Sequence, residues 1–589
     1  MVDRLWAHSA RDGDRLRHGL ADHLRGTSWR ASAFGEVFGA GPLAAHCGLL
    51  HDVGKGSCQW QRGPINAERL GGRVGIPHKH AGTWLLDQHG LGIMSAVVFG
   101  HHGGLPDATR LKKELRFADT DPLVAEAIRR VGEAVPEIHP SEPIAPPTWL
   151  TEAADADPYA LDLLVRMVYS TVVDADFLDT EQHFAGVARP FHPVSAADLA
   201  ERFEQGRQNL LENKPKSPID GLRQEVYRQC VEAAQGPRGI YRIPAPTGSG
   251  KTFAAGGFSL EHARVHGMKR VVVAVPFMSI TEQNASVYRD LLDAEGEHPV
   301  VLEHHSGIDL DDGRAGRRWQ RLAAENWDAP FVVTTTIRLF ESLFSHKPAA
   351  MRRMHRLAGS VIVLDEVQAL PDRLLSPIMS ALRSLTQWFG ATVVLASATQ
   401  PPFELLSPLH GTRIRDVIVD PKPLYKALSR VRYRWLLDPK PTMAQIAEQA
   451  AAEPQVLVVV NTTRDAARMH ELVEEHRPAL HLSTRMAAAH RRAACCALPV
   501  LIGSGLLTEA GAAVAEQALL AVAGLLLAAA AGMWWLHRRR TARADATAGS
   551  CGCRTGGVAA DAECAPRGSG FRGIPASNRS AQSGFGRAT

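Results

Sequence analysis

The stretch Ala245–Thr252, with the sequence Ala-Pro-Thr-Gly-Ser-Gly-Lys-Thr, constrains the fold of this chain more than any other segment. Its end resembles a P-loop, although Ala245 stands where a general P-loop has glycine. In such a loop glycines let backbone N–H groups close around phosphates, the lysine reaches the β- and γ-phosphates, and the threonine hydroxyl holds Mg²⁺. We therefore expect ATP with Mg²⁺ to bind at Thr247, Gly248, Ser249, Gly250, Lys251 and Thr252.

Short runs of β-branched residues after this loop predict a parallel sheet, because strands buried on both faces are almost uniformly apolar. Stretches compatible with helices separate the runs, which is typical of a doubly wound α/β domain. In such a domain ligands bind at the carboxyl ends of the strands. The runs are 271–276, 331–335, 361–364 and 392–396.

Two further motifs follow these runs directly. Asp365 and Glu366 come after the third run, where the first carboxylate would hold Mg²⁺ and the second would position an attacking water. Ser397-Ala-Thr399 comes after the fourth. The P-loop and these two motifs, in this order, resemble the nucleic-acid helicases and translocases of superfamily two.

The first third of the chain predicts a metal site. His51-Asp52 follows an apolar stretch and resembles the centre of the HD phosphohydrolase superfamily. Imidazole and carboxylate ligands suit Fe, Mn, Ni, Co, Zn or Mg, which ligand type alone does not distinguish. A divalent metal lowers the pKa of bound water to about 7, so His51 and Asp52 are candidate catalytic residues. The further candidate ligands are His78, His101, His102 and Asp176.

Two alternatives stay open at this site. Asp174 and Asp176 lie two positions apart on an expected helix and face different ways, so at most one is a ligand. Asp176 is preferred, because Asp-Phe-Leu resembles the Asp-x-Leu ending of the superfamily. Isolated histidines are more often ordinary structural residues, and that is the expectation for His8, His18, His46, His80 and His89.

An HD-type domain followed by a superfamily-two motor resembles the CRISPR-associated helicase-nuclease of type I systems. The resemblance covers about residues 1–492 and adds His23 as a metal ligand. The segments that carry it are 6–9, 22–24, 48–55, 100–107, 275–284, 304–306, 364–368, 459–464 and 481–485.

The resemblance implies a role in antiviral defence. Such enzymes join an RNA-guided surveillance complex that has opened an R-loop, nick the displaced single-stranded DNA, and use ATP to reel DNA in the 3′-to-5′ direction. Two other interpretations remain: an HD nucleotide phosphohydrolase fused to an unrelated ATPase, or a truncated, nearly inert protein that binds nucleic acid or ATP.

The composition is compatible with a cytoplasmic, multidomain protein. The chain has 589 residues and a net charge of +4, so nucleic-acid contacts depend on local patches. Only Cys47, Cys58 and Cys230 lie in the first 490 residues, without paired spacing, which fits a reducing compartment. The charged N-terminus lacks the apolar segment of a signal peptide.

The resemblance stops after Arg492. The Gln-x-x-Gly-Arg-x-x-Arg helix that supplies arginine fingers in the family is not found in 493–589, so we expect an impaired motor. Residues 518–536 carry no charge and would span about 28 Å as a helix, close to a bilayer core. The tail could be a membrane anchor, a buried apolar helix, or a frameshifted or recombined gene end, which is the preferred explanation.

The expected fold is therefore an all-α HD domain followed by α/β RecA-like P-loop lobes and an apolar helical and disordered tail. The expected divisions are the HD domain at 1–205, the first lobe at 219–425, a partial second lobe at 426–492 and the tail at 493–589.

Overall fold

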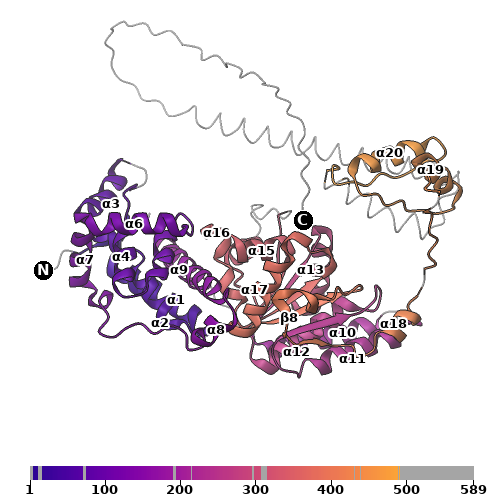
Figure 1. Cartoon of the computed structure of the whole chain (residues 1–589), viewed down its shortest axis with the longest axis horizontal. Helices are drawn as coiled ribbons and strands as arrows, with labels where there is room; N and C mark the ends of the chain where they lie inside the picture. The colour runs from indigo at the N-terminus through magenta and orange to yellow at the C-terminus, as the bar shows by residue number, and fades with distance from the viewer. Residues whose placement is uncertain are drawn as a thin grey trace, which may run out of the picture. The chain divides into compact units, whose positions relative to one another are not determined.

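The computed structural model describes residues 4–487 and 490, apart from 11–15, 71–73, 190–193, 214, 295–297, 307–314, 430 and 438. The chain divides into two compact units, Met1–Val431 and Arg432–Thr589, which are described separately (Figure 1). None of the described helices is long and apolar enough to cross a membrane. The apolar segment 518–536 lies outside the described residues.

The N-terminal part of the first unit is mostly helical, as expected from the sequence, although a short strand pair makes it not purely α. The longest helix, α9 (Ala160–Ala185), packs against α1, α2 and α5, and it is apolar over most of its circumference because these helices surround it. A short antiparallel pair, β1 (Trp6–His8) with β2 (His18–Gly19), precedes the helices. The others are α1 (Leu20–Gly35), α2 (Gly41–Leu50), α3 (Cys58–Leu70), α4 (His80–Gln88), α5 (Ser95–Gly100), α6 (Ala108–Thr120), α7 (Pro122–Ala134), α8 (Leu150–Ala156), α10 (Ala196–Glu212) and α11 (Asp220–Ala233).

A seven-stranded parallel sheet follows, with the strand order β5-β6-β4-β7-β8-β3-β9. All four predicted runs are strands of this sheet: β4 (Arg270–Val275), β6 (Phe331–Thr335), β7 (Ser360–Asp365) and β8 (Thr392–Ser397). The remaining strands are β3 (Ile240–Pro244), β5 (Val301–His304) and β9 (Ile414–Asp416). The helices between them are α12 (Lys251–His266), α13 (Met278–Leu292), α14 (Ala315–Asn326), α15 (Thr336–Phe344), α16 (Pro348–Met351), α17 (Leu375–Trp388) and α18 (Lys422–Ala427).

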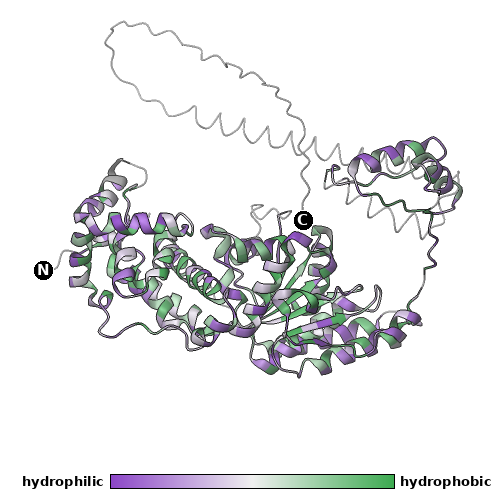
Figure 2. Cartoon of the chain, in the orientation of Figure 1, coloured by the Kyte–Doolittle hydropathy of each residue, from purple (hydrophilic) through white to green (hydrophobic). Residues whose placement is uncertain are grey.

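Both faces of the sheet are buried, which explains the nearly continuous apolar runs of β4, β6, β7 and β8 (Figure 2). Val271 and Val273 of β4 pack into a core with α10, α11, α12 and α13. Val272 and Ala274, on the other face, belong to a core that contains α15, α17 and the N-terminal helices. The helical region and the sheet therefore share one hydrophobic core.

Ring contacts and buried ion pairs connect the helical region to the sheet. Phe38 lies 5.5 Å from Phe389 between ring centroids, and Trp149 stacks on Trp388 at 5.8 Å. The carboxylate of Asp174 on α9 is fully buried and lies 2.9 Å from Nε of Arg352, which precedes β7. An uncompensated buried charge is costly, so this pair favours one arrangement of the two parts.

The second unit contains two described helices, α19 (Met443–Ala452) and α20 (Thr463–Glu474), each with a threonine N-cap. They pack together around Ala447 and Met469. The segment around Val459, which resembles the opening of a second helicase lobe, is not paired as a strand in the described part of this unit. The side chain of Val459 is 81% exposed.

We predict that Asp174→Ala destabilises the folded chain, because Arg352 would lose its buried carboxylate and keep only Glu325, whose side chain is 39% exposed. Removing one member of a buried pair costs about 3–5 kcal/mol. Denaturation followed by tryptophan fluorescence measures the change, since Trp149 and Trp388 lie at the same contact. Asp162→Ala, which breaks the exposed pair with Arg166, is the control and should cost no more than about 1 kcal/mol. Equal midpoints for the two variants would contradict the prediction.

Candidate metal centre and nucleotide site

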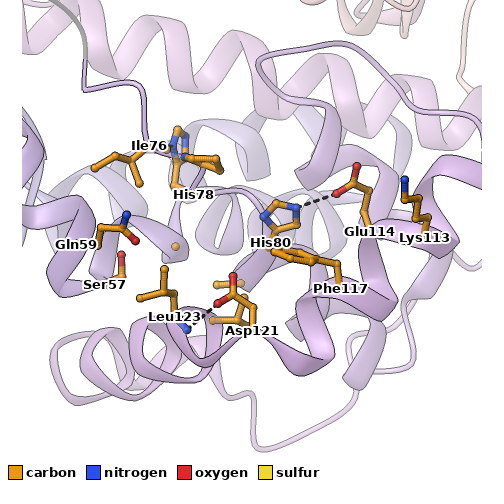
Figure 3. A pocket seen from close by; sticks show the side chains of 14 residues that line it. Ser57, Gln59, Ile76, His78, His80, Lys113, Glu114, Phe117, Asp121 and Leu123 are labelled. Atoms are coloured by element: carbon orange, nitrogen blue, oxygen red, sulfur yellow. Dashed lines mark hydrogen bonds and ion pairs between the residues drawn. The ribbon is translucent and has the colours of Figure 1, made fainter.

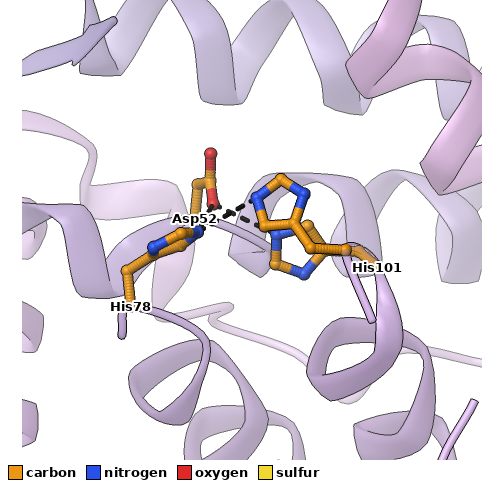
Figure 4. A group of neighbouring side chains, drawn as sticks. Asp52, His78 and His101 are labelled. Carbon is orange, nitrogen blue, oxygen red and sulfur yellow. Dashed lines mark hydrogen bonds and ion pairs between the residues drawn. The ribbon is translucent and has the colours of Figure 1, made fainter. Parts of the chain in front are cut away.

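The seven side chains that the sequence singles out as metal ligands lie in two groups that share Asp52. Within each group, one ligand atom from every residue lies within 4.8 Å of the others. Figure 4 shows Asp52 beside His78 and His101. The first group is His23, His51, Asp52 and Asp176, and the second is Asp52, His78, His101 and His102.

Four of the histidines have their ring orientation fixed by a hydrogen bond at Nδ1. A carbonyl or carboxylate oxygen only accepts, so Nδ1 carries the hydrogen and Nε2 faces the centre, as in metal-binding histidines. The acceptors are the carbonyl oxygens of Gly48 for His51 (2.7 Å), Val98 for His101 (2.6 Å) and Ile76 for His78 (3.1 Å), and Oδ2 of Asp179 for His23 (2.8 Å).

The centre needs positive charge, because acceptor atoms face one another in it. Asp52 Oδ1 and His101 Nε2 are 3.3 Å apart and buried, and neither has a hydrogen-bond partner among the described residues. Burial lowers the pKa of His51, but Asp52 and Asp176 outweigh it and raise that pKa to about 10. A divalent cation displaces such a proton, so these residues fit metal binding.

Lys55 is a member of this centre that sequence reasoning missed. Its Nζ lies 2.5 Å from Asp52 Oδ2, and the side chain is almost fully buried. Burial acts to raise the pKa of Asp52, but Lys55, His51 and His78 outweigh it and hold the pKa well below its usual range. Lys55 lies in the same Gly48–Lys55 motif as the His-Asp pair, so the motif itself carried the signal.

Glycine is required within this motif by the approach of the His78 segment. A Cβ atom on Gly54 would lie 1.8 Å from the carbonyl oxygen of His78, so only glycine leaves room for that backbone. The close approach brings His78 Nε2 to 3.2 Å from Asp52 Oδ1.

The two aspartates left open by the sequence have different surroundings. Asp176 Oδ1 lies 3.4 Å from His23 Nε2 and 3.6 Å from His51 Nε2. Asp174 instead accepts from Arg352 and, at 3.0 Å, from Asn326 Nδ2. Asp176 is thus in the centre and Asp174 is outside it.

The histidines expected to be ordinary divide into two kinds. His46 pairs with His89 at 3.0 Å, and His80 pairs with Glu114 at 2.9 Å. His8 and His18, however, have ring nitrogens close to His23 and form a third group with it. Asp179, one helical turn after Asp176, was also missed, and it holds His23 in place through its contact with Nδ1.

The P-loop lies between β3 and α12, as expected from its sequence. Gly248 and Gly250 have φ of 88° and 83°, a left-handed conformation that suits glycine. Lys251 and Thr252 open α12, whose first amide groups have no partner within the helix and attract phosphate. Ser249 Oγ is buried without a partner among the described residues. The loop therefore fits a nucleotide phosphate.

The acidic pair lies beside the P-loop, because β7, β8 and β3 are neighbours in the sheet. Lys251 Nζ is 2.7 Å from Glu366 Oε1 and 3.5 Å from Asp365 Oδ1. Glu366 has φ 49° and ψ 51°, a conformation that is uncommon for residues other than glycine and is found at functional sites.

Residues at the end of β8 contact this acidic pair. Ser397 Oγ donates to Gln368 Oε1, and Gln368 Nε2 donates to Glu366 Oε2 at 2.7 Å. Gln368 thus links the Ser397-Ala-Thr399 motif to the acidic pair of Asp365 and Glu366.

Two family models match different parts of the chain. The DEAD/DEAH box helicase model matches residues 225–406, which contain the P-loop, the acidic pair and Ser397–Thr399. The model of the mercuric transport protein MerT matches residues 469–553. That second match begins within α20 and includes the apolar segment 518–536.

Several of the known proteins similar to this chain are CRISPR-associated. The CRISPR-associated nuclease/helicase Cas3 of Haloferax volcanii is 27% identical over 223 residues, which are 34% of this chain and 22% of that protein. The crystal structure of T. fusca Cas3-ATP is 20% identical with a TM-score of 0.48, covering 70% of this chain and 52% of that one. A second crystal structure, of a CRISPR-associated protein, is 17% identical with a TM-score of 0.44, covering 74% and 55%.

The chain thus spans about a fifth of the length of the curated relative and about half of these two solved structures. The similarity confirms the resemblance inferred from the sequence motifs. Part of the chain is thus similar in sequence to a CRISPR-associated nuclease/helicase, and residues 225–406 match the DEAD/DEAH box helicase model.

Proposed function

We propose that this chain is a metal-dependent nuclease for single-stranded DNA joined to an ATP-dependent helicase lobe. The observation that carries the proposal is the pair of ligand groups sharing Asp52, in a helical region that packs on the same core as the P-loop sheet. The relationship to Cas3 supports an RNA-guided surveillance complex and its displaced DNA strand as partners. We also propose the division into an HD domain, a first helicase lobe, a partial second lobe and a tail.

The nuclease reaction depends on how these residues would hold divalent ions. Divalent ions bound there supply Lewis acidity, which activates water and stabilises charge on the phosphate. His23, His51, Asp52 and Asp176 would hold one ion, and Asp52, His78, His101 and His102 would hold a second. Lys55 keeps Asp52 ionised, and Asp179 keeps the lone pair of His23 Nε2 directed at the centre.

On the nucleotide side, the chain's own residues bind and orient the phosphates. Lys251 contacts two carboxylates, so an incoming phosphate competes with Glu366 for its ammonium group. Asp365 would hold Mg²⁺, and Glu366 would position water for attack on the γ-phosphate. Gln368 connects Glu366, the carboxylate that would position water, to Ser397 at the end of β8.

We propose that the motor is impaired in this chain. Hydrolysis in this class needs arginine fingers from the second lobe, which contribute about 10³–10⁵ in rate. The stretch in which that lobe continues in the family matches the MerT model instead, from residue 469. This match supports the recombined gene end among the three explanations of the tail.

We predict that Asp52→Asn lowers cutting of single-stranded DNA more than about 100-fold, because the residue belongs to both ligand groups. Metal content should fall in parallel, as elemental analysis measures. His89→Ala, a histidine outside the centre, should keep both. Lys251→Ala should weaken ATP binding and leave ATP-free cutting intact. Full cutting by Asp52→Asn, or cutting of free nucleotides but not DNA, would contradict the proposed function.

We predict slow ATP hydrolysis by the full 589-residue chain, with little stimulation by single-stranded DNA and no unwinding. The missing arginines leave the charge that develops on the γ-phosphate uncompensated. Phosphate release with and without DNA measures both quantities, and Lys251→Ala gives the background rate. Strong stimulation by DNA would show that residues after 492 supply a working lobe.

The alternative explanation of the tail, a membrane anchor, predicts that the full chain sediments with membranes in bacterial lysates, because the MerT match includes 518–536 and three arginines follow that segment. Leu526→Arg places a charge, costing about 2.5–3.5 kcal/mol, at the middle of the segment and should shift the protein to the supernatant. Leu457→Arg, outside the segment, is the matched control. Identical distributions of all three proteins would contradict membrane association.

A further inference from the structure

An open cavity of about 510 Å³ lies beside the candidate metal centre, since His78 belongs to both. Figure 3 shows the side chains that line the cavity. Its size is within the range of about 300–1,000 Å³ that is usual for small-molecule sites. It lies between the segment before α4, the segment after the His-Asp motif, and the helices α6 and α7. Its apolar lining includes Ile76, Pro77, Phe117 and Leu123, and its polar lining includes His78, Lys113 and Glu114.

The cavity and the metal centre share a wall. His78 lines the cavity, and its Nε2 lies 3.2 Å from Asp52 Oδ1 in the second ligand group. Gly54 also lines it, two residues after Asp52. A molecule whose phosphate binds at the metal centre therefore has its neighbouring chemical group at the mouth of this cavity.

The lining suits a flat aromatic group. Phe117 is 53% exposed and presents its ring beside the imidazole of His80, with 5.1 Å between ring centroids. Ile76, Pro77 and Leu123 supply further apolar surface. An exposed aromatic ring in a cavity next to a phosphate site is the arrangement on which nucleic-acid bases stack.

Both carboxylates that line the cavity already accept hydrogen bonds, so Lys113 is the charged lining residue that can contact a phosphate. Glu114 is engaged by His80 at 2.9 Å, and Asp121 accepts from the amide of Leu123 at 3.0 Å. Lys113 is exposed on α6 and forms no hydrogen bond or ion pair with the described residues, so its ammonium is available to a phosphate. One carboxylate is thus paired, the other caps a helix, and one cation remains for the strand.

We propose that this cavity binds the nucleobase next to the cut phosphodiester, with Phe117 stacking on the base and Lys113 contacting a flanking phosphate. The inference rests on the proposed nuclease function and adds a subsite to it. Stacking does not depend on base identity, so the subsite holds the strand in position without selecting a sequence. The same chemistry would accept the base of a free nucleotide.

The test uses the full chain with Mn²⁺ and single-stranded oligonucleotides in which one abasic position is moved along the strand. Loss of the stacked base should reduce cutting about 5- to 150-fold at bonds with one fixed offset from the abasic position. Phe117→Ala should reduce cutting of intact DNA by the same factor and show no further loss with the abasic strand. Phe117→Trp should restore both the rate and the abasic effect.

Trp29→Ala, which removes a 70% exposed aromatic ring from α1, is the matched control and should cut as the parent does. A strand with 2-aminopurine at the fixed offset reports binding without cutting, and its quenching should be lost in Phe117→Ala. Parental rates for Phe117→Ala, or reductions by the variant and the abasic site that multiply, would overturn the subsite. Cutting of free deoxynucleotides alone by the parent would overturn the proposed function instead and assign the cavity to a mononucleotide.

Discussion

The structure depends on the burial of two carboxylates from one helix. Asp174 and Asp176 lie two positions apart on α9 and therefore face in different directions. Asp176 enters the metal centre, and Asp174 pairs with Arg352 next to the sheet. Because neither buried charge is stable without a partner, α9 is held between the metal centre on one side and the helicase lobe on the other. The centre and the interface are thereby fixed by the same element.

Both candidate sites consist of charges arranged for an ionic ligand. In the helical region, lone pairs of imidazoles and carboxylates face one another and require a cation. At the P-loop, the site suits an anion, since Lys251 and the start of α12 attract negative charge. Two carboxylates, Asp365 and Glu366, lie beside Lys251. The two candidate sites therefore suit opposite charges: a cation in one and a phosphate in the other.

Sequence motifs predicted the sheet, because each buried strand has its own local pattern. Short motifs also predicted one group of candidate metal ligands and, separately, one group of candidate phosphate-binding residues. The sequence was less informative where contacts cross the fold. Asp179 contacts His23 across 156 positions, and nothing in its spacing marks that contact. His8 and His18 were expected to be ordinary, but β1 and β2 bring them beside His23. The segment around Val459 has the composition of a strand, yet pairing depends on neighbours that local composition does not specify.

The shared core has a consequence for how the two chemistries can be studied apart. Trp149 and Phe38 are covered by Trp388 and Phe389, and the sheet face that carries Val272 and Ala274 shares its core with the N-terminal helices. A polypeptide cut between residues 205 and 219 would leave apolar surface on both fragments, which favours aggregation. Point substitutions, rather than truncation, are therefore the appropriate way to silence one site while the other is assayed.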